Sequence, residues 1–407
     1  MRYANRLICV VVGCLILAAS SSSRAQDWPQ WRGPNRDAKI TGFVEPETWP
    51  EDLTQEWKVI VGLGDAGPAL ANGRLYVHTR QGNEEVIMAL DAGTGREIWS
   101  QKNSAPNMSG PARQHSGPRS TPCVAQGKVV ALGAGGVLTC LDMGGRIIWR
   151  EDPFPGIVPR FFVGMSPMVV GDTVIAHLGG AGNGALIAYD LNTGEERWRW
   201  SEEGPEYGSP VLLRADGTTQ IVTLTEKGLV GVNLTDGALL WRRPFAPRRL
   251  AVNCTTPIVD GQTVIYTGQN RGTIAVKIEK QGDEFTATEL WNKKNVSTWF
   301  CTPVLSGWML FGLSQQGNIF CLSTATGGEL WTNDTKHDRF GTVLDAGSVL
   351  MAITPRSPLI VFRGNNFRYE EVAKYKVADT PVYAQPAVAG DAIYIKDQES
   401  LAKWTIK

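Results

Sequence analysis

Short apolar runs alternate with polar, glycine-containing turns along almost the whole chain after residue 53. A typical stretch, 121–132, reads TPCVAQGKVVAL, in which two apolar runs flank the turn at Gln126 and Gly127. A third run follows and ends in Leu-Asp, and a fourth carries a tryptophan. Runs of this length, separated by tight turns, predict a four-stranded antiparallel meander. One such sheet cannot bury both of its faces, so it must stack on neighbouring sheets.

The third and fourth runs form a recurring segment. Its clearest copies are Ala89 to Trp99 (ALDAGTGREIW) and Ala188 to Trp198 (AYDLNTGEERW). Successive copies are 40 to 50 residues apart, which is the length of a propeller blade. The aromatic residues that close the copies are Trp57, Trp99, Trp149, Trp198, Trp241, Trp291, Trp331 and Tyr375.

The repeats predict an all-β, eight-bladed β-propeller of four-stranded antiparallel blades. Seven full repeats run from Gly67 to Lys376, and Ala384 to Lys407 supplies only three further strands. The apolar run at 53–60 supplies the fourth, so the N-terminal strand is expected to complete the last blade and close the ring. We therefore divide the chain into a signal peptide (1–25), an N-terminal extension (26–52) and the propeller (53–407).

The pattern Asp-x-x-Thr-Gly-x-x-x-Trp has a mechanical interpretation. Asp and Thr bond backbone groups of the turn, Gly adopts a positive φ, and Trp packs on the next blade. These aromatics are therefore expected to dock the blades on one another, at the outer strands and away from the channel. Trp28 and Trp31 lie in the extension, and we expect them to matter much less for stability.

The first 25 residues resemble a secretory signal. Arg2 and Arg6 precede an apolar run, Leu7 to Ala19, that is too short to span a bilayer, and small residues before Gln26 suit a cleavage site. A lipoprotein anchor at Cys14 is disfavoured, because apolar residues follow this cysteine. We expect an extracytoplasmic protein, periplasmic or secreted, without a transmembrane segment.

Charge and cysteine content exclude several classes of protein. Without the first 25 residues, the chain has 37 basic and 40 acidic residues, which argues against nucleic-acid binding. Five cysteines remain, an odd number with no zinc spacing, and their pairing stays open; Cys140 and Cys321 replace alanines of other repeats, so we expect them to be small buried residues. No nucleophile, phosphate-loop or metal-spaced histidine motif is present, so we predict no catalytic residues and no metal site.

A candidate binding site comes from aligning the repeats. The residue three positions before the proline that opens each inner strand should lie at one mouth of the channel. These residues are Asp65, Arg119, Gly164, Tyr207, Cys254, Phe300, Phe340 and Tyr383, with Arg160, Phe161, Phe162, Trp299 and Arg339 close to them in sequence. Binding surfaces are enriched in aromatic residues and arginine. Packing between loops is the alternative interpretation of the same residues.

With its repeated Ala-x-Asp-x-x-Thr-Gly-x-x-x-Trp, the chain resembles the pyrroloquinoline-quinone-repeat propellers over nearly its whole length after the signal region. One branch of that family contains alcohol dehydrogenases with a quinone and calcium in the channel, and another contains a non-catalytic propeller lipoprotein of outer-membrane assembly. The dehydrogenases have a disulfide between adjacent cysteines, and no two cysteines are adjacent here. The resemblance therefore favours the second branch, although a shared fold does not determine function.

These observations predict a monomeric, non-catalytic binding or scaffolding propeller without a cofactor, which recognises a protein or peptide partner at the channel mouth. Two alternatives stay open. One is a dehydrogenase that uses pyrroloquinoline quinone with calcium, and the other is a carbohydrate-binding propeller.

Overall fold

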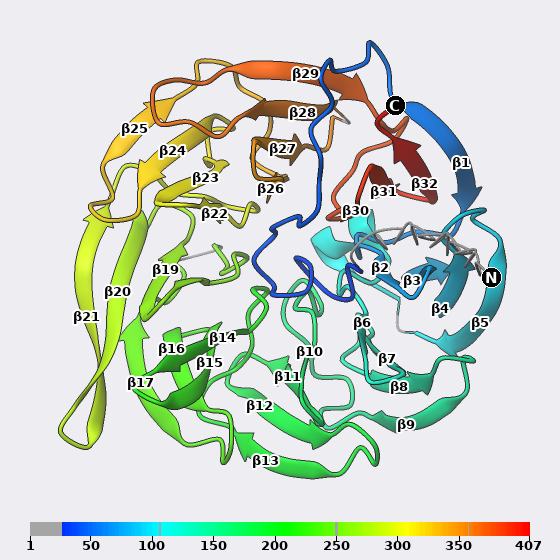
Figure 1. Cartoon of the computed structure of the whole chain (residues 1–407). Coiled ribbons are helices and arrows are strands. Elements are labelled where there is room, and N and C mark those ends of the chain that lie inside the picture. Colours follow the sequence, from blue (N-terminus) through cyan, green and yellow to red (C-terminus); the bar gives the residue numbers. More distant parts are fainter. Residues whose placement is uncertain (1–26, 106, 249–250, 357) are drawn as a thin grey trace, which may run out of the picture.

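The computed structural model describes residues 27–105, 107–248, 251–356 and 358–407, so the predicted signal peptide and Cys14 lie outside the described residues. The described chain forms eight four-stranded antiparallel sheets around a central channel (Figure 1). This confirms the predicted all-β, eight-bladed propeller. The only helix in the described part is the short 3₁₀ helix η1 (Gly110–His115).

Each of blades 1 to 7 uses four consecutive strands, the first beside the channel and the last at the rim. Blades 1 and 2 consist of β2 (Ala69–Ala71), β3 (Arg74–Gln81), β4 (Glu84–Asp91), β5 (Glu97–Ser104), β6 (Cys123–Ala125), β7 (Lys128–Leu132), β8 (Leu138–Asp142) and β9 (Ile147–Glu151). Blades 3 and 4 consist of β10 (Met168–Val170), β11 (Thr173–Gly180), β12 (Asn183–Asp190), β13 (Glu196–Trp200), β14 (Val211–Ala215), β15 (Thr218–Leu224), β16 (Gly228–Asn233) and β17 (Leu239–Pro244).

The second half of the ring follows the same plan. Blades 5 and 6 consist of β18 (Ile258–Asp260), β19 (Thr263–Thr267), β20 (Thr273–Gln281), β21 (Glu284–Lys293), β22 (Val304–Ser306), β23 (Met309–Leu313), β24 (Ile319–Ser323) and β25 (Glu329–Thr332). Blade 7 consists of β26 (Thr342–Asp345), β27 (Val349–Ile353), β28 (Pro358–Arg363) and β29 (Glu371–Lys376).

Blade 8 closes the ring with strands from both ends of the chain. It consists of β30 (Ala387–Ala389), β31 (Ala392–Lys396), β32 (Ser400–Thr405) and the N-terminal strand β1 (Thr54–Ile60). β1 pairs antiparallel with β32, from Thr54 opposite Thr405 to Ile60 opposite Ser400. The pairing gives β32 the outer neighbour that its own part of the chain lacks, and this leaves no blade with three strands.

The repeated turn is built as its residue types require. In blade 3, Asp190 accepts hydrogen bonds from the backbone N–H groups of Asn192 (2.7 Å) and Thr193 (3.0 Å). Gly194 follows with a φ of 78°, and a Cβ placed there would lie 2.8 Å from the ring of Trp149 in blade 2. Glycine is therefore required at this position for two reasons, the backbone conformation and the close approach of the indole.

Six of the repeat tryptophans donate their indole N–H to a carbonyl oxygen in the outer turn of the next blade. The pairs are Trp57 with Ala92 (3.3 Å), Trp99 with Met143 (2.9 Å), Trp149 with Leu191 (2.9 Å), Trp198 with Leu234 (3.0 Å), Trp291 with Thr324 (2.7 Å) and Trp331 with Asn365 (2.9 Å). Tyr375 donates instead to the carbonyl oxygen of Pro50 (2.8 Å). These seven aromatics thus join the rims of all blades except blade 4 to a neighbouring segment.

Trp241 departs from this pattern, because it donates to Gln220 of its own blade (2.6 Å). The next blade lacks the short outer turn and has the long hairpin β20–β21 in its place, which Figure 1 shows projecting from the rim. The indole lies over Gly231, where a Cβ would come within 2.2 Å of it. Blades 1, 2, 3, 5 and 6 have Ala or Cys at this position.

A belt of hydroxyl groups joins the inner ends of blades 2 to 6. In each of these blades a Ser or Thr precedes the proline of the inner strand, and in blades 3 to 6 its hydroxyl accepts the backbone N–H of the matching residue in the preceding blade. The bonds run from Thr121 to Ser166 (3.0 Å), Ser166 to Ser209 (2.9 Å), Ser209 to Thr256 (3.2 Å) and Thr256 to Thr302 (3.0 Å). The repeated Ser/Thr-Pro pair is therefore a link between blades as well as the start of a strand.

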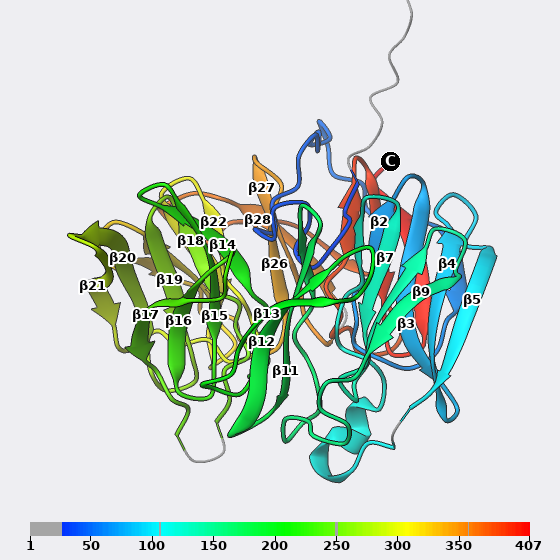
Figure 2. The same cartoon turned by 90° about the horizontal axis from the view of Figure 1, so that it is seen from below.

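Residues 27–40, called here the N-terminal segment, cross one end of the channel (Figures 1 and 2). Trp28 forms a two-way antiparallel bridge with Leu70 of β2, with both N–H···O distances 2.8 Å. Trp28 is only 3 % exposed. The expectation that it contributes little was wrong, because the segment is packed into the propeller and does not lie outside it.

Two arginines of the N-terminal segment fill the channel end. Arg36 donates to the carbonyl oxygens of Ser166 (3.0 Å), Pro167 (3.0 Å) and Pro210 (2.9 Å). Arg32 does the same on the other side of the channel, to Thr302 and Pro303. Burial lowers the pKa of each guanidinium to about 10, so both remain charged at neutral pH.

The five cysteines in the described part of the chain are free thiols, and Cys140 and Cys321 are buried. They pack as the small residues that the repeat alignment predicts. No helix among the described residues has the length and apolarity needed to cross a membrane.

Candidate functional site

The predicted mouth residues lie on the connections that lead from the rim of one blade to the inner strand of the next. These connections include η1, and Figure 2 shows η1 on the face opposite the N-terminal segment. The mouth is therefore the end of the channel that the N-terminal segment leaves open. Loops on a rigid scaffold are common sites of binding.

Five aromatic rings form a continuous arc along the mouth, called here the aromatic arc. Trp299 stacks on Phe300 with 4.6 Å between ring centroids, and Phe300 stacks on Phe340 at 4.0 Å and 3°. A parallel backbone bridge joins Phe300 to Phe340, which explains why their rings face each other. The arc continues edge-on to Tyr383 (5.5 Å) and then to His115 (4.7 Å). All five side chains are half-buried.

His115 links the aromatic arc to an acidic residue. Its Nδ1 lies 2.6 Å from Oδ2 of Asp65, one of the predicted ring positions. Sequence reasoning missed His115, which is the last residue of η1. The signal that could have identified it is the long connection between β5 and β6, which is the only one in the described chain that contains a helix.

A second group of contacts completes the mouth on the side of blades 2 to 4. Arg119 donates to the carbonyl oxygens of His115 (3.0 Å) and Phe161, and burial lowers its pKa. The Tyr207 hydroxyl accepts the N–H of Phe161 at 2.9 Å, and burial raises the pKa of Tyr207. A Cβ on Gly164 would lie 3.1 Å from the Tyr207 ring, so glycine at that ring position makes room for the tyrosine.

The remaining mouth residues differ in exposure. The exposed guanidinium groups of Arg160 and Arg339 lie over Phe161 (5.2 Å) and Trp299 (4.7 Å), where a cation–π contact holds each of them. Phe162 does not join them, because it packs against a small buried cluster that contains Met108. For Phe162 the structure therefore supports the packing interpretation.

Half-buried ionisable groups lie beside the mouth next to the predicted residues. Glu206 accepts the backbone N–H of Asn253 at 2.7 Å, and burial raises its pKa to about 7. Cys254, a predicted ring position, has a raised pKa for the same reason, so it is a protonated thiol and a poor nucleophile. Arg271 donates to the Asn253 side chain at 2.6 Å. Sequence reasoning missed Glu206 and Arg271, because nothing in the repeat marks their burial.

Comparison with known proteins decides the family. The family described as outer membrane protein assembly factor BamB matches residues 44–180 and 83–333. This chain belongs to the BamB family.

Individual relatives agree with this assignment. BamB of Shewanella oneidensis is 21 % identical over 416 residues, which cover 97 % of this chain and 96 % of the relative. The crystal structure of BamB from Moraxella catarrhalis superposes with a TM-score of 0.66 at 15 % identity, covering 87 % of this chain and 99 % of that one. Quinohemoprotein alcohol dehydrogenase from Comamonas testosteroni superposes with a TM-score of 0.70 at 14 % identity, covering 95 % and 81 %. At such identities the superpositions show the shared propeller fold alone.

The fold relationship raises the question of whether a quinone with calcium fits this chain. The described residues contain no group of three or more His, Cys, Asp or Glu side chains that could hold a metal ion. One end of the channel is filled by Arg32 and Arg36, which are bonded to carbonyl oxygens of the inner strands. A calcium ion prefers carboxylate oxygens and would be repelled by two guanidinium groups. The side chains at this end of the channel therefore do not fit a calcium ion.

Proposed function

We propose that this protein is a non-catalytic binding or scaffolding propeller outside the cytoplasm, which recognises a protein or peptide partner at the channel mouth. The single observation that carries the proposal is the aromatic arc, five half-buried rings contributed by loops of different blades and flanked by exposed arginines. Such rings offer a large contact area at a small cost in conformational entropy, and arginine extends that area with hydrogen bonds.

Membership of the BamB family supports this proposal, because the relatives carry the name of an outer-membrane assembly factor. The location outside the cytoplasm rests on the signal-like residues 1–25. Cleavage after Ala25 and lipid attachment at Cys14 are distinguished by the mass of the mature N-terminus. The family match gives no reason to disfavour attachment at Cys14.

The test uses two substitutions that leave the buried contacts of the mouth in place. Arg160→Glu with Arg339→Glu reverses two exposed charges, and Arg368→Glu, at an exposed arginine between β28 and β29 and outside the mouth connections, is the control. We expect the double variant to fold normally and to lose at least about tenfold of its partner capture from an extracytoplasmic extract. The control variant should capture the partner as the wild type does.

A second variant tests the aromatic rings themselves. Tyr207→Ala, Phe300→Ala and Tyr383→Ala together should weaken capture if the rings bind the partner. Loss of folding would favour the packing interpretation, and capture equal to wild type by a folded triple variant would place the site elsewhere. Retention of pyrroloquinoline quinone after incubation with calcium, seen by absorbance and mass analysis, would instead support a dehydrogenase. Binding of soluble oligosaccharides that the triple variant lacks would support a carbohydrate-binding propeller.

A further inference from the structure

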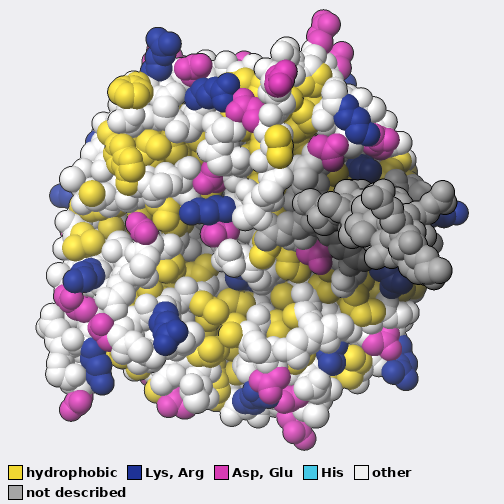
Figure 3. Space-filling view, viewed as in Figure 1, with side chains coloured by type: hydrophobic (Ala, Val, Ile, Leu, Met, Phe, Trp, Pro, Cys, Tyr) yellow, Lys and Arg dark blue, Asp and Glu magenta, His cyan; other side chains and the backbone are white. Residues whose placement is uncertain are grey.

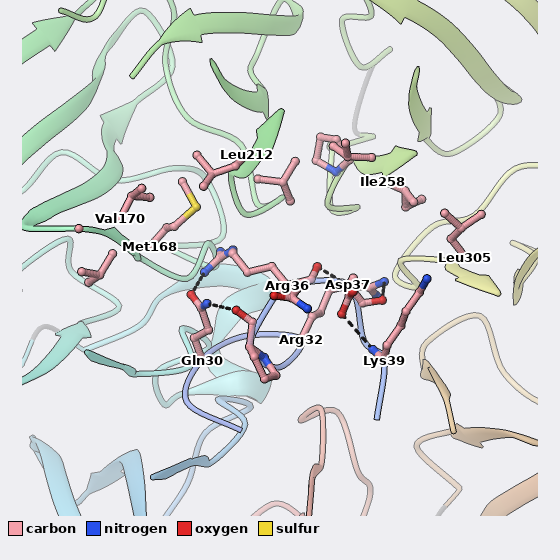
Figure 4. A pocket seen from close by; sticks show the side chains of 17 residues that line it. Gln30, Arg32, Arg36, Asp37, Lys39, Met168, Val170, Leu212, Ile258 and Leu305 are labelled. Atoms are coloured by element: carbon pink, nitrogen blue, oxygen red, sulfur yellow. Dashed lines mark hydrogen bonds between the residues drawn. The ribbon is translucent and has the colours of Figure 1, made fainter. Parts of the chain in front are cut away.

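A cavity of about 560 Å³ opens beside the N-terminal segment, on the face opposite the mouth (Figure 4). The N-terminal segment forms one wall, and the inner strands of blades 3 to 6 form the other. The second wall is apolar, with side chains that include Met168, Val170, Leu212, Ile258 and Leu305. Figure 3 shows hydrophobic side chains gathered near the centre of this face. The volume lies within the range of pockets that bind ligands.

The apolar wall is built from equivalent positions in the inner strands of several blades. The middle residue of a short inner strand pairs with a residue of the second strand of the same blade. Leu70 pairs with Leu75 in blade 1, and Val169 pairs with Val174 in blade 3. Val259 and Leu305 occupy the same register position in blades 5 and 6. Val169, Val259 and Leu305 line the cavity, and so does Leu212 of blade 4.

In blades 1 and 2 the same register position already holds an extended chain. The backbone N–H and C=O of Leu70 both bond Trp28, and the N–H of Val124, the middle residue of β6, bonds the carbonyl oxygen of Pro29 at 2.8 Å. Across the channel in blade 7, Asp345 exchanges two backbone bonds with the chain around Lys39. The inner edge of a blade therefore forms backbone hydrogen bonds with a crossing extended chain in three places. Among the described residues, the N-terminal segment forms no bridge with the inner strands that line the cavity.

The charged residues around the cavity indicate which kind of ligand it would bind. Arg32, Arg36 and Lys39 line it together with a single carboxylate, Asp37, which already accepts the N–H of Lys39 at 3.2 Å. Figure 4 shows Lys39 at the end of the cavity near Leu305. The excess of positive charge beside an apolar wall favours a chain that carries both apolar and acidic side chains.

We infer that this cavity binds an extended acidic peptide segment of a partner protein, which crosses the inner strands of blades 3 to 6 and forms backbone hydrogen bonds with them. Main-chain hydrogen bonds hold the segment, as they hold Trp28 on Leu70. Alternate apolar side chains lie on the wall formed by Met168, Leu212 and Ile258, and acidic ones face the N-terminal segment. The inference is independent of the mouth, because the two sites are at opposite ends of the channel.

The test uses three blocked, fluorescein-labelled pentapeptides and fluorescence anisotropy. The sequence Val-Glu-Leu-Glu-Val alternates apolar and acidic residues, Val-Lys-Leu-Lys-Val reverses the charge, and an N-methylated form of the acidic peptide lacks backbone donors. We expect the acidic peptide to bind with a Kd below about 1 mM and each of the others about tenfold more weakly. Failure of the acidic peptide to bind wild-type protein at that concentration would overturn the inference.

Variants locate the bound peptide. Leu212→Arg obstructs the apolar wall and Lys39→Glu reverses the charge at the rim, so each should weaken binding of the acidic peptide about tenfold. Phe367→Arg and Lys128→Glu are matched controls, because Phe367 is 83 % exposed and neither residue lines the cavity. Equal binding by all four variants, each with the thermal midpoint of the wild type, would show that the peptide binds elsewhere. Equal binding of the N-methylated peptide would overturn the inferred backbone hydrogen bonds.

Discussion

At the scale of single residues, the repeat tryptophans illustrate how one chemical group can act in six equivalent places. All six donate the indole N–H to a carbonyl oxygen in the next turn, and all but Trp331 also pack against a glycine of that turn. A tryptophan at such a site stabilises by area removed from water and by a hydrogen bond that would otherwise be lost on burial. Trp28 has the same kind of environment although it belongs to no repeat.

This environment predicts large effects of truncation. Trp99→Ala and Trp198→Ala should each lower the free energy of unfolding by about 3–5 kcal/mol, the usual cost of deleting a buried aromatic side chain. Trp28→Ala should cost a similar amount, because its ring is buried against Gly33. Urea denaturation measures all three. Trp308→Ala serves as the control, since Trp308 is 51 % exposed and should cost little. A midpoint for Trp28→Ala close to that of the control would contradict the packing seen here.

The contact between Trp241 and Gly231 allows a second kind of stability prediction, in which a side chain is enlarged and not truncated. Gly231→Ala would place a methyl group 2.2 Å from the indole and should destabilise the protein by about 1–3 kcal/mol, as overpacking does. Ala188→Gly, the reverse change at the equivalent position of blade 3, should cost at most about 1 kcal/mol. Chemical denaturation of the two variants gives the comparison. A neutral Gly231→Ala variant would mean that Trp241 rotates freely to another position.

Glu206 predicts how stability depends on pH. Burial raises its pKa in the folded protein to about 7, above the usual value of 4.5. The folded state therefore holds this proton more tightly than the unfolded state, and stability falls as the pH rises from about 4.5 through 7. Glu206→Gln should remove this decline, so the difference in unfolding free energy between variant and wild type should grow over that interval. Parallel curves for the two proteins would exclude Glu206 as the source.

At the scale of elements, two kinds of link join one blade to the next at different distances from the channel. The tryptophans act at the rim, and the belt of hydroxyl groups from Thr121 to Thr302 acts near the channel. The N-terminal segment adds a third link, because Arg32 and Arg36 bond inner strands of several blades at once. Its two guanidinium groups satisfy carbonyl oxygens that face the channel and have no partner within a sheet.

The arginine links predict a stability effect that depends on hydrogen bonds more than on charge. Arg36→Met keeps much of the side-chain volume and leaves the carbonyl oxygens of Ser166, Pro167 and Pro210 without this donor. We expect a loss of about 2 kcal/mol or more, since each buried polar group left unpaired costs about 1–3 kcal/mol. Thermal unfolding of Arg36→Met and of Arg36→Lys measures the effect. Lysine should restore only part of the loss, because it cannot reach three acceptors with a planar fork.

At the scale of the whole molecule, closure of the ring depends on a strand that is distant in sequence from its partner. β1 pairs with β32 across more than three hundred residues of chain. Deleting residues 26–60 should leave the edge of β32 unpaired and remove the N-terminal segment, so the truncated protein should aggregate or unfold at a lower temperature. Size-exclusion chromatography and circular dichroism provide the measurement. A stable, monomeric truncation would contradict closure by β1.

The sequence by itself determined the architecture of this protein, because the repeat encodes turns, strands and blade contacts through interactions between residues that are close in sequence or at equivalent positions. Asp, Thr and Gly set the outer turn, alternating apolar residues set the strands, and the spacing of the tryptophans sets the number of blades. Repeat alignment also led to the mouth positions, since equivalent residues of a ring lie at the same height. The closing aromatic position recurs eight times, and each copy supports the same interpretation.

Tertiary structure alone decided what the non-repeating residues do. Nothing in the local pattern around Arg32, Arg36 or His115 indicates their partners, which come from blades far away in the sequence. The direction of the Trp241 indole depended on the hairpin of the neighbouring blade, and the burial of Trp28 depended on the path of the N-terminal segment across the channel. The physical reason is the same in each case. A repeat encodes contacts between equivalent positions, whereas a residue outside the repeat acquires its environment only when the ring has closed around it.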